Sequence, residues 1–194
     1  MCSSDLAVMG DAYTLEAFVA DLRRAAPAGT RPHDALLAVQ PLAQRFAASE
    51  DLRRRCNRKC DPEQGFGFQL LHEEPDHNLA VAALSWLPGR GTPPHDHGTW
   101  GVVVGVEGDE VNTFWLRTDD RSRDGHAVLE KLSEKVFPPG AVIGLAPDII
   151  HSVRNDGKEV SVSLHVYGRN INFTGRSQFD PERRTVVPWI VKQN

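Results

Sequence analysis

From Phe66 onward, the sequence alternates between short apolar runs and clusters of turn residues. The runs have the length and the β-branched or aromatic content of strands, and the sequence 155–157, Asn-Asp-Gly, is a hairpin signal between two of them. The runs expected to form strands are 66–71, 79–87, 100–106, 111–116, 127–131, 142–145, 151–154, 160–167 and 186–191. Many short strands joined by tight turns are typical of a small barrel or jelly roll, so this part is predicted to be mostly β.

The first third of the chain has helical periodicity instead. Apolar residues recur at helical spacing between Thr14 and Arg24, and Thr14 is the predicted N-cap. A second helix is expected to be capped by Asp34, to run toward Phe46, and to be interrupted or restarted at Pro41. The predicted fold is therefore a β barrel preceded by N-terminal α-helices.

A single domain is expected for this chain of 194 residues, because its 40% hydrophobic content suffices for one buried core. Within the domain 1–194, we assign residues 1–62 to the N-terminal helical segment and residues 63–194 to the barrel. The helices are expected to pack on the barrel and to cover a face or an edge of a sheet.

Cysteine usage and charge restrict the setting and the partners. The chain has 3 cysteines, an odd number, and Cys56 and Cys60 lie in the basic segment 53–60, which we interpret as helical. An odd number of cysteines, in a sequence without a signal-peptide pattern or a transmembrane run, predicts a reduced, cytoplasmic protein that does not contact a membrane. The net charge of -4 argues against nucleic-acid binding. The role of the two cysteines and the oligomeric state stay open.

Three histidines form a candidate metal site. His95 and His97 follow Pro93-Pro94 at an i, i+2 spacing, which at the start of a strand puts both imidazoles on one face. His151 stands in a later predicted strand. Imidazole ligands suit iron, zinc, copper and nickel, so the ligand type predicts a metal without naming it.

The surroundings of these histidines resemble the two sequence motifs of the cupin superfamily. Gly89, the His95-x-His97 pair and Gly108 resemble the first motif, and Pro139-Gly140 followed by His151 and Asn155 resembles the second. The resemblance spans about residues 66–168 and implies a jelly-roll, double-stranded β-helix barrel with a metal inside. Many cupins carry a glutamate where this chain has Gly101, so a site of three neutral imidazoles is expected.

The strand 160–167 adds a second polar set. Alternation places Ser163, His165 and Tyr167 on one face and apolar residues on the other. Three hydrogen-bonding side chains on the barrel side would be costly if they were unpaired, so we expect them to form a connected chain.

With this strand, residues 60–180 resemble the cysteine dioxygenase family of thiol dioxygenases. The shared features are the histidine pair, the third histidine, the Ser-x-His-x-Tyr relay and Trp86. The resemblance implies that His95, His97 and His151 bind Fe(II), and that the catalytic relay residues Ser163, His165 and Tyr167 assist the oxidation of a small thiol by O2 to a sulfinic acid. Tyr167 would hydrogen-bond to the reacting oxygen or to substrate. The segment 98–102 contains no cysteine, so the thioether crosslink of the animal enzymes cannot form.

Within that family, the chain is most like the bacterial 3-mercaptopropionate dioxygenases. At the position where cysteine dioxygenases carry a carboxylate-binding arginine, this chain has Gln69, and an arginine is found after the relay at Arg176 instead. Arginine binds a carboxylate through two parallel hydrogen bonds, which glutamine cannot supply. The predicted substrate-binding residues are Arg176 and Gln69, and Arg169 is a competing candidate.

Several alternatives stay open. Cysteine or mercaptosuccinate is the alternative substrate within the family, and barrel-lining residues such as Trp100 and Phe68 are expected to bear on the choice. A cupin isomerase, or a different dioxygenase, is the alternative enzyme. A metal-dependent sensor is the non-enzymatic alternative.

Overall fold

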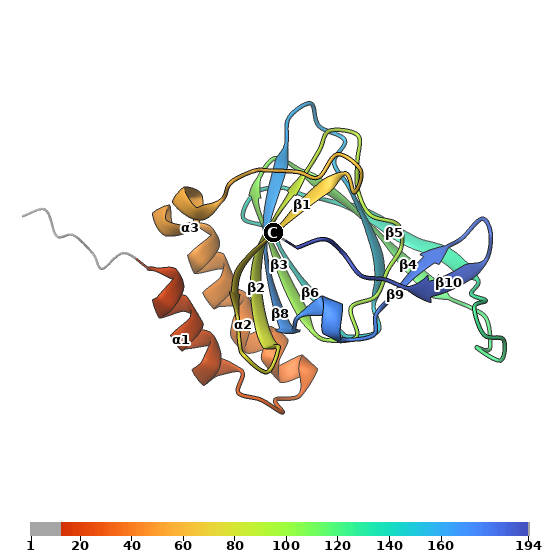
Figure 1. Ribbon diagram of the computed structural model, residues 1–194, viewed down its shortest axis with the longest axis horizontal. Coiled ribbons are helices and arrows are strands. Elements are labelled where there is room, and N and C mark those ends of the chain that lie inside the picture. Colours follow the sequence, from red (N-terminus) through yellow and green to blue (C-terminus); the bar gives the residue numbers. More distant parts are fainter. Residues whose placement is uncertain (1–12, 194) are drawn as a thin grey trace, which may run out of the picture.

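The computed structural model describes residues 13–193, and its helices precede its strands as the sequence predicts (Figure 1). Residues 1–12 of the predicted helical segment lie outside the described residues. The helices are α1 (Leu15–Ala25), α2 (Pro32–Ala47), α3 (Glu50–Arg55) and a 3-10 turn, η1 (Ile171–Phe173). The strands are β1 (Phe66–Glu73), β2 (Asn78–Trp86), β3 (Gly101–Glu107), β4 (Glu110–Arg117), β5 (Leu129–Phe137), β6 (Val142–Leu145), β7 (Ile150–Arg154), β8 (Ser161–Arg169), β9 (Ser177–Asp180) and β10 (Thr185–Pro188).

The two long helices form where apolar residues recur at helical spacing. α1 begins after Thr14, whose hydroxyl accepts a hydrogen bond from a first-turn amide at 3.3 Å, so the predicted N-cap is confirmed. α2 differs from the prediction, because it begins at Pro32 with Arg31 at the cap position instead of Asp34, and it continues through Pro41. Proline is tolerated at a helix start, where its missing N–H needs no partner. Pro41 lies on the exposed side of α2, where water can hydrate the carbonyl that loses its bond.

The basic segment 53–60 is helical only in its first part. α3 begins after Ser49, whose hydroxyl accepts a hydrogen bond from the Leu52 amide at 3.2 Å, and it ends at Arg55. Beyond it the backbone is extended at Cys56 and takes a φ of 50° at Arg58, a value that no α-helix contains. The predicted helix over 56–60 is therefore wrong.

The strands form two antiparallel sheets that face each other. One sheet has the order β1-β2-β8-β3-β6, the other has the order β5-β4-β7, and β9 pairs with β10 in a further hairpin. The chain passes back and forth between the sheets, as in a jelly roll. The fold is mostly β, a jelly-roll, double-stranded β-helix barrel with N-terminal helices, as predicted.

The five-stranded sheet is buried on both faces. Its outer face packs against the three helices through apolar residues of β2, β3 and β8, for example Val81, Val102 and Leu164 (Figure 1). Its inner face contributes Phe68 and Trp86 to a second cluster inside the barrel. The helices thus cover one face of the barrel.

β5 runs on to Phe137, beyond the end predicted at residue 131, and the last strands differ from the prediction as well. The sequence predicts one strand over 186–191, but β10 ends at Pro188, and residues 189–193 cross back over the barrel (Figure 1). β9, over Ser177–Asp180, is not predicted, because its alternation is too short to be recognised. These two elements bring the chain after β8 to the mouth of the barrel.

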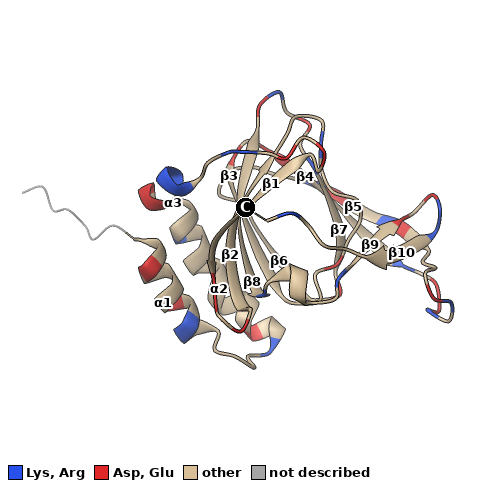
Figure 2. Ribbon diagram, viewed as in Figure 1, with Lys and Arg blue, Asp and Glu red and all other residues tan. Residues whose placement is uncertain are grey.

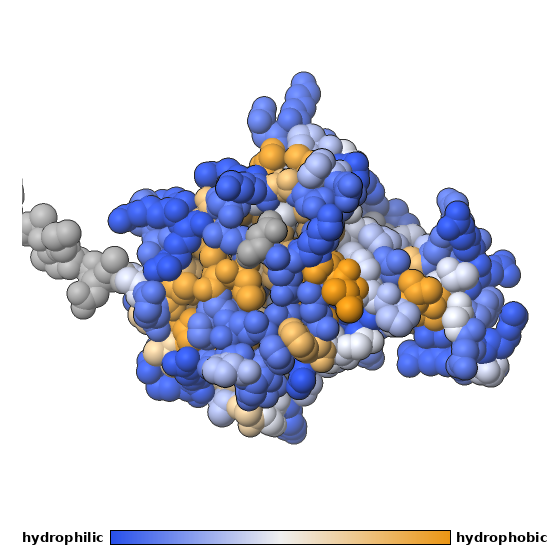
Figure 3. Space-filling model, in the orientation of Figure 1, coloured by the Kyte–Doolittle hydropathy of each residue, from blue (hydrophilic) through white to orange (hydrophobic). Residues whose placement is uncertain are grey.

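Charged residues lie on the helices, on the loops and on β5, and the strands of the five-stranded sheet carry few of them (Figure 2). On the face drawn in Figure 3, apolar residues form small patches among hydrophilic ones. No helix within residues 13–193 is both long enough and apolar enough to cross a membrane.

Candidate metal centre

The three histidines come from two segments that pair with each other. His95 and His97 lie in the loop between β2 and β3, not at the start of a strand as predicted, and His151 lies in β7. The backbone amides of His95 and His151 each donate to the other's carbonyl, at 2.8 and 3.0 Å. Asp96 accepts a hydrogen bond from the Ser177 amide at 2.8 Å, which ties the loop to β9. The loop is therefore held in an extended form, which keeps the two imidazoles close together.

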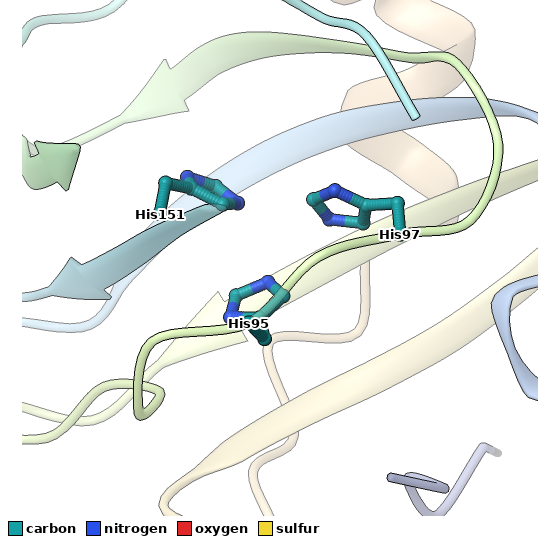
Figure 4. A group of neighbouring side chains, drawn as sticks. All are labelled: His95, His97 and His151. Atoms are coloured by element: carbon teal, nitrogen blue, oxygen red, sulfur yellow. The ribbon is translucent and has the colours of Figure 1, made fainter. Parts of the chain in front are cut away.

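The three imidazoles converge inside the barrel (Figure 4). One ring nitrogen from each of His95, His97 and His151 lies within 4.8 Å of the other two, and the side chains are almost completely buried. Ring centroids are 4.6 to 5.1 Å apart. Three imidazoles at this spacing can bind one ion, so the predicted metal-binding group is brought together.

Hydrogen bonds at the back of the rings leave front nitrogens for a metal. The Nδ1 of His95 lies 2.9 Å from the Pro93 carbonyl, and the Nδ1 of His151 lies 2.8 Å from Oδ1 of Asn112. Both acceptors fix the hydrogen on Nδ1. Nε2 of His151 and Nδ1 of His97 are buried without a hydrogen-bond partner. Nε2 of His151 is thus free to bind an ion, and one ring nitrogen of each histidine lies close to those of the other two, so the residues fit a divalent metal.

Burial keeps these rings neutral, which is the form that binds metals. It lowers the pKa of His95 and His97 well below the usual value, and it lowers the pKa of His151 to about 3. The nearby Arg176 charge acts in the same direction at all three. Neutral imidazoles add no negative charge to a divalent ion.

Gly101 shapes the site as well as omitting a carboxylate ligand. A Cβ built at Gly101 would lie 3.1 Å from the Tyr167 ring, so any side chain there would displace the tyrosine. Among the residues from 13 to 193, the metal-binding group contains histidines alone. This agrees with the expected site of three neutral ligands.

The predicted relay forms a continuous chain of hydrogen bonds along β8. The Oγ of Ser163 lies 2.8 Å from Nε2 of His165, and Nδ1 of His165 lies 2.7 Å from the Tyr167 hydroxyl. Trp86 extends the chain, because its indole N–H donates to Ser163 at 3.2 Å. All of these side chains are buried. The ring of Tyr167 stacks 5.5 Å from that of His97, which brings the end of the relay to the metal-binding group.

Arg176 is a buried arginine that forms no ion pair with any residue between 13 and 193, although the charge of Asp96 acts to raise its pKa. It directly precedes β9, whose Gln178 bridges to His95, and its side chain is 3% exposed. Its Nε and Nη2 are buried without hydrogen-bond partners. Burial lowers the pKa of Arg176 to about 10, so the guanidinium stays charged at neutral pH.

A small cavity joins these groups. Its volume is about 20 Å³, measured as the space open to the centre of a water molecule. Apolar and aromatic side chains form most of its wall, and its polar wall consists of Thr92, Trp86, the three candidate ligands, two relay residues and Arg176. The metal-binding group, Tyr167 and the arginine therefore line one cavity.

Gln69 and Arg169 do not face this cavity. Gln69 lies on the outer face of β1, where its amide donates to the Arg55 carbonyl at 2.8 Å and accepts from the Asn57 amide at 3.0 Å. Both ends of the amide are thus used to hold the chain after α3, and the side chain does not reach the cavity. Arg169 is exposed and donates to the Phe173 carbonyl. Of the predicted substrate-binding residues, only Arg176 reaches the site.

Three residues of the site were missed by sequence reasoning. Asn112 orients His151, Glu110 lies on the same inward face of β4, and Trp189 lies in the segment after β10. Alternation along β4 would have placed Glu110 and Asn112 inside together. Nothing in the sequence indicates that Trp189 returns to the barrel.

Glu110 is predicted to make the stability of the protein depend on pH. Burial raises its pKa from 4.5 to about 7, although Ser163 and Trp86 beside it partly offset the rise. Between these pH values the unfolded chain releases the proton while the folded chain keeps it, so the free energy of unfolding falls as pH rises. The loss approaches about 3 kcal/mol above pH 7.

Glu110→Gln removes this proton exchange. We expect the variant to gain stability relative to the unmodified protein on going from pH 4 to pH 8, measured by urea unfolding at each pH. Parallel stability curves for the two proteins would show that Glu110 does not titrate in this range.

Comparisons with known proteins give the following likenesses. No family model matches the chain. TT1209 from Thermus thermophilus has a TM-score of 0.46 and 21% identity, over 62% of this chain and 95% of that chain. A recombinant oxalate oxidase in complex with glycolate has a TM-score of 0.46 and 16% identity, over 57% of this chain and 54% of that chain. A cupin domain of an XRE family transcriptional regulator from Enterobacter cloacae has a TM-score of 0.39 and 15% identity, over 55% of this chain and 99% of that chain. Likenesses of this size carry no conclusion about activity.

Proposed function

We propose that this protein is a non-haem Fe(II) thiol dioxygenase that oxidises a small carboxylated thiol, with 3-mercaptopropionate favoured, to its sulfinic acid with O2. The observation that carries the proposal is Arg176, a buried and unpaired cation in the same cavity as three convergent imidazoles. An uncompensated buried charge is costly, so it indicates an anionic ligand. The relay that ends at Tyr167 supports the thiol dioxygenase class.

The candidate ligands are His95, His97 and His151. Fe(II) held by them would supply the coordination positions at which a thiolate and O2 react. The overall reaction needs no other reductant, because the sulfur gains both oxygen atoms and supplies the electrons that O2 takes up.

Arg176 presents the edge that a carboxylate needs. Nε and Nη2 are the two nitrogens through which Arg117 binds Asp119 in this same molecule, at 2.8 and 2.9 Å. In Arg176 the same pair has no partner within residues 13–193. A ligand carboxylate would take the place that Asp119 occupies in that other pair, through two parallel charge-assisted hydrogen bonds.

The charges on the cavity wall favour 3-mercaptopropionate over other thiols. Among the described residues, the cavity is lined by no aspartate or glutamate, so the ammonium of cysteine would have no counter-charge there. Mercaptosuccinate has two carboxylates, whereas Arg176 is the one charged side chain on the described wall. Cysteamine would put its ammonium near the guanidinium. A thiol with one carboxylate and no amine matches the wall best.

The relay holds the Tyr167 hydroxyl in a defined direction. Trp86 can only donate, so Ser163 accepts its N–H. Burial lowers the pKa of His165 to about 3, so this ring is neutral and has one donor and one acceptor nitrogen. Ser163 has one hydroxyl hydrogen, for which Glu110 is a second acceptor. In the arrangement in which Ser163 donates to Nε2 of His165, His165 donates from Nδ1 to Tyr167, and the phenol hydrogen is left for a ligand in the cavity. In that arrangement Tyr167 acts as a hydrogen-bond donor to the reacting oxygen or the substrate.

Tyr167→Phe is expected to lower kcat by about a hundredfold while leaving the metal content unchanged, because loss of one positioned donor removes stabilisation of developing charge. Steady-state oxygen uptake and elemental analysis on the same preparation would measure both quantities. Loss of metal from this variant would indicate that Tyr167 supports the ligands and is not a catalytic residue.

Oxygen consumption tests the proposal directly. Oxygen uptake by the iron-loaded protein is measured with 3-mercaptopropionate, L-cysteine, cysteamine and mercaptosuccinate at equal concentrations. The sulfinate product is identified by mass. We expect the highest kcat/KM for 3-mercaptopropionate. Preference for cysteine or mercaptosuccinate would keep the dioxygenase and overturn the substrate assignment. No uptake with any thiol would overturn the proposed function and favour the other cupin chemistries.

A further inference from the structure

The segment of residues 189–193 is fastened across the mouth of the barrel, and we call it the strap (Figure 1). On one side, Asn172 exchanges two hydrogen bonds with the Val191 backbone, at 2.9 and 3.0 Å. On the other side, the Lys192 amide donates to Gln64 at 2.9 Å, and its ammonium lies 2.9 Å from a carboxylate oxygen of Asp61. The strap thus links the chain before β1 to the chain after β8.

The strap places one aromatic ring inside the mouth. Trp189 and Val191 line the cavity, whereas Ile190 between them is 74% exposed. The guanidinium carbon of Arg176 lies 4.0 Å from the centre of the Trp189 ring, and the Trp189 amide donates to the Arg176 carbonyl at 3.0 Å. The same ring meets the edge of the His95 ring, with 4.9 Å between centroids. Trp189 therefore contacts both the carboxylate-binding and the metal-binding groups.

These contacts give the ring two separable effects. A cation over an aromatic face is attracted to it, and the attraction grows when water is excluded, so Trp189 fixes the plane of the guanidinium and leaves its Nε and Nη2 edge free. Its bulk also narrows the mouth of the cavity, which the ring lines together with Val191. The first effect favours binding of a carboxylate, and the second limits the size of the molecule attached to it.

We propose that Trp189 is a specificity-determining residue, whose ring holds Arg176 for a single carboxylate and excludes thiol acids that carry a second large substituent. The inference rests on the proposed function, because it concerns the same cavity. It explains how a barrel with one arginine discriminates between 3-mercaptopropionate and bulkier thiol acids such as mercaptosuccinate.

Four variants separate the two effects. Trp189→Phe keeps an aromatic face and should resemble the unmodified protein. Trp189→Leu keeps bulk without the aromatic face, so KM for 3-mercaptopropionate should rise roughly three- to thirtyfold with little change in kcat. Trp189→Ala should show the same rise in KM and should also raise kcat/KM for mercaptosuccinate relative to 3-mercaptopropionate. Ile190→Ala is the matched control, because the Ile190 side chain is next to Trp189 in the chain but points to solvent. This variant should change neither KM for 3-mercaptopropionate nor the kcat/KM of mercaptosuccinate relative to 3-mercaptopropionate.

Binding is measured in addition to turnover. Anaerobic titration calorimetry with 3-mercaptopropionate should show weaker binding to the leucine variant and unchanged binding to Ile190→Ala, at equal metal content. Unchanged affinity and unchanged substrate ratio in the leucine and alanine variants would overturn the inference. If the alanine variant does not fold, the leucine and phenylalanine variants decide the aromatic effect and Trp189→Val decides the size effect.

The outcomes also distinguish this inference from the proposed function. If the unmodified protein binds 3-mercaptopropionate but consumes no oxygen with any thiol, the proposed dioxygenase is wrong, and the variants still report on the role of Trp189 in carboxylate binding. If the protein oxidises the thiol and Trp189→Leu behaves like the unmodified protein, only the role of Trp189 is wrong. If the unmodified protein neither binds nor oxidises the thiol, both are wrong.

Discussion

Replacing His151 with alanine is expected to abolish metal binding and, with it, thiol oxidation. Three imidazoles form the whole metal-binding group within the described chain, so removing one leaves two neutral ligands on a divalent ion. Loss of a hydrogen-bond partner outside the ligands already costs about 10- to 100-fold in metal affinity, and loss of a ligand should exceed that range. Metal titration with a competing chelator, followed by oxygen uptake, measures both effects.

Two comparison variants make this experiment specific. Asn112→Leu removes the acceptor that orients His151 while leaving all three rings. Its metal affinity should fall by about 10- to 100-fold and so lie between that of the unmodified protein and that of the His151 variant. His33→Ala removes an exposed histidine and should bind metal normally. Normal metal binding by the His151 variant would show that the ion is held elsewhere or that two histidines suffice.

The relay was predictable because strand alternation depends only on the local sequence. In β8, a period of two decides which side chains are inside, and Ser163, His165 and Tyr167 do lie on the inner face. The same reasoning, applied to β4, would have found Glu110 and Asn112. Turn chemistry likewise predicted where most strands end.

Features that depend on pairing between distant segments were not predictable. Counting back along the chain from Trp86 selects Gln69 as a substrate-binding residue. In the structure, the residue of β1 that pairs with Trp86 is Phe66. Side chains alternate between the two faces of a strand, so Gln69, an odd number of positions from Phe66, lies on the opposite face of β1. His95 and His97 are extended because of bonds to His151 and Ser177, which a local pattern does not contain. Trp189 returns to the barrel through tertiary contacts alone.

Replacing Arg176 is expected to have the largest effect on substrate choice. Truncating one partner of a buried, hydrogen-bonded charge pair costs about 2 to 5 kcal/mol. Arg176→Ala should therefore lower kcat/KM for 3-mercaptopropionate by roughly 30-fold to several thousandfold, mainly through KM. Cysteamine has no carboxylate, so its own low rate should change little. Arg176→Lys should recover only part of the loss, because a lysine has no planar pair of donors.

Exposed Arg169 supplies the matched control, since Arg169→Ala removes the same charge from a side chain that does not face the cavity. Its kcat/KM should stay normal for both thiols. Equal losses on 3-mercaptopropionate and cysteamine in the Arg176 variant would remove Arg176 from carboxylate binding.

The stability of a further Arg176 variant tests independently whether the arginine serves ligand binding or folding. Nε and Nη2 of Arg176 are buried without partners, and a buried charge that lacks a partner destabilises the folded state. Arg176→Met, which keeps an unbranched apolar side chain in the same space, should therefore unfold at an equal or higher temperature than the unmodified protein while losing carboxylate binding. A residue that served only the fold would give the opposite result, a lower melting temperature with normal kinetics. Saturating 3-mercaptopropionate under anaerobic conditions should raise the melting temperature of the unmodified protein and leave that of Arg176→Met unchanged, because a ligand stabilises only the state that binds it.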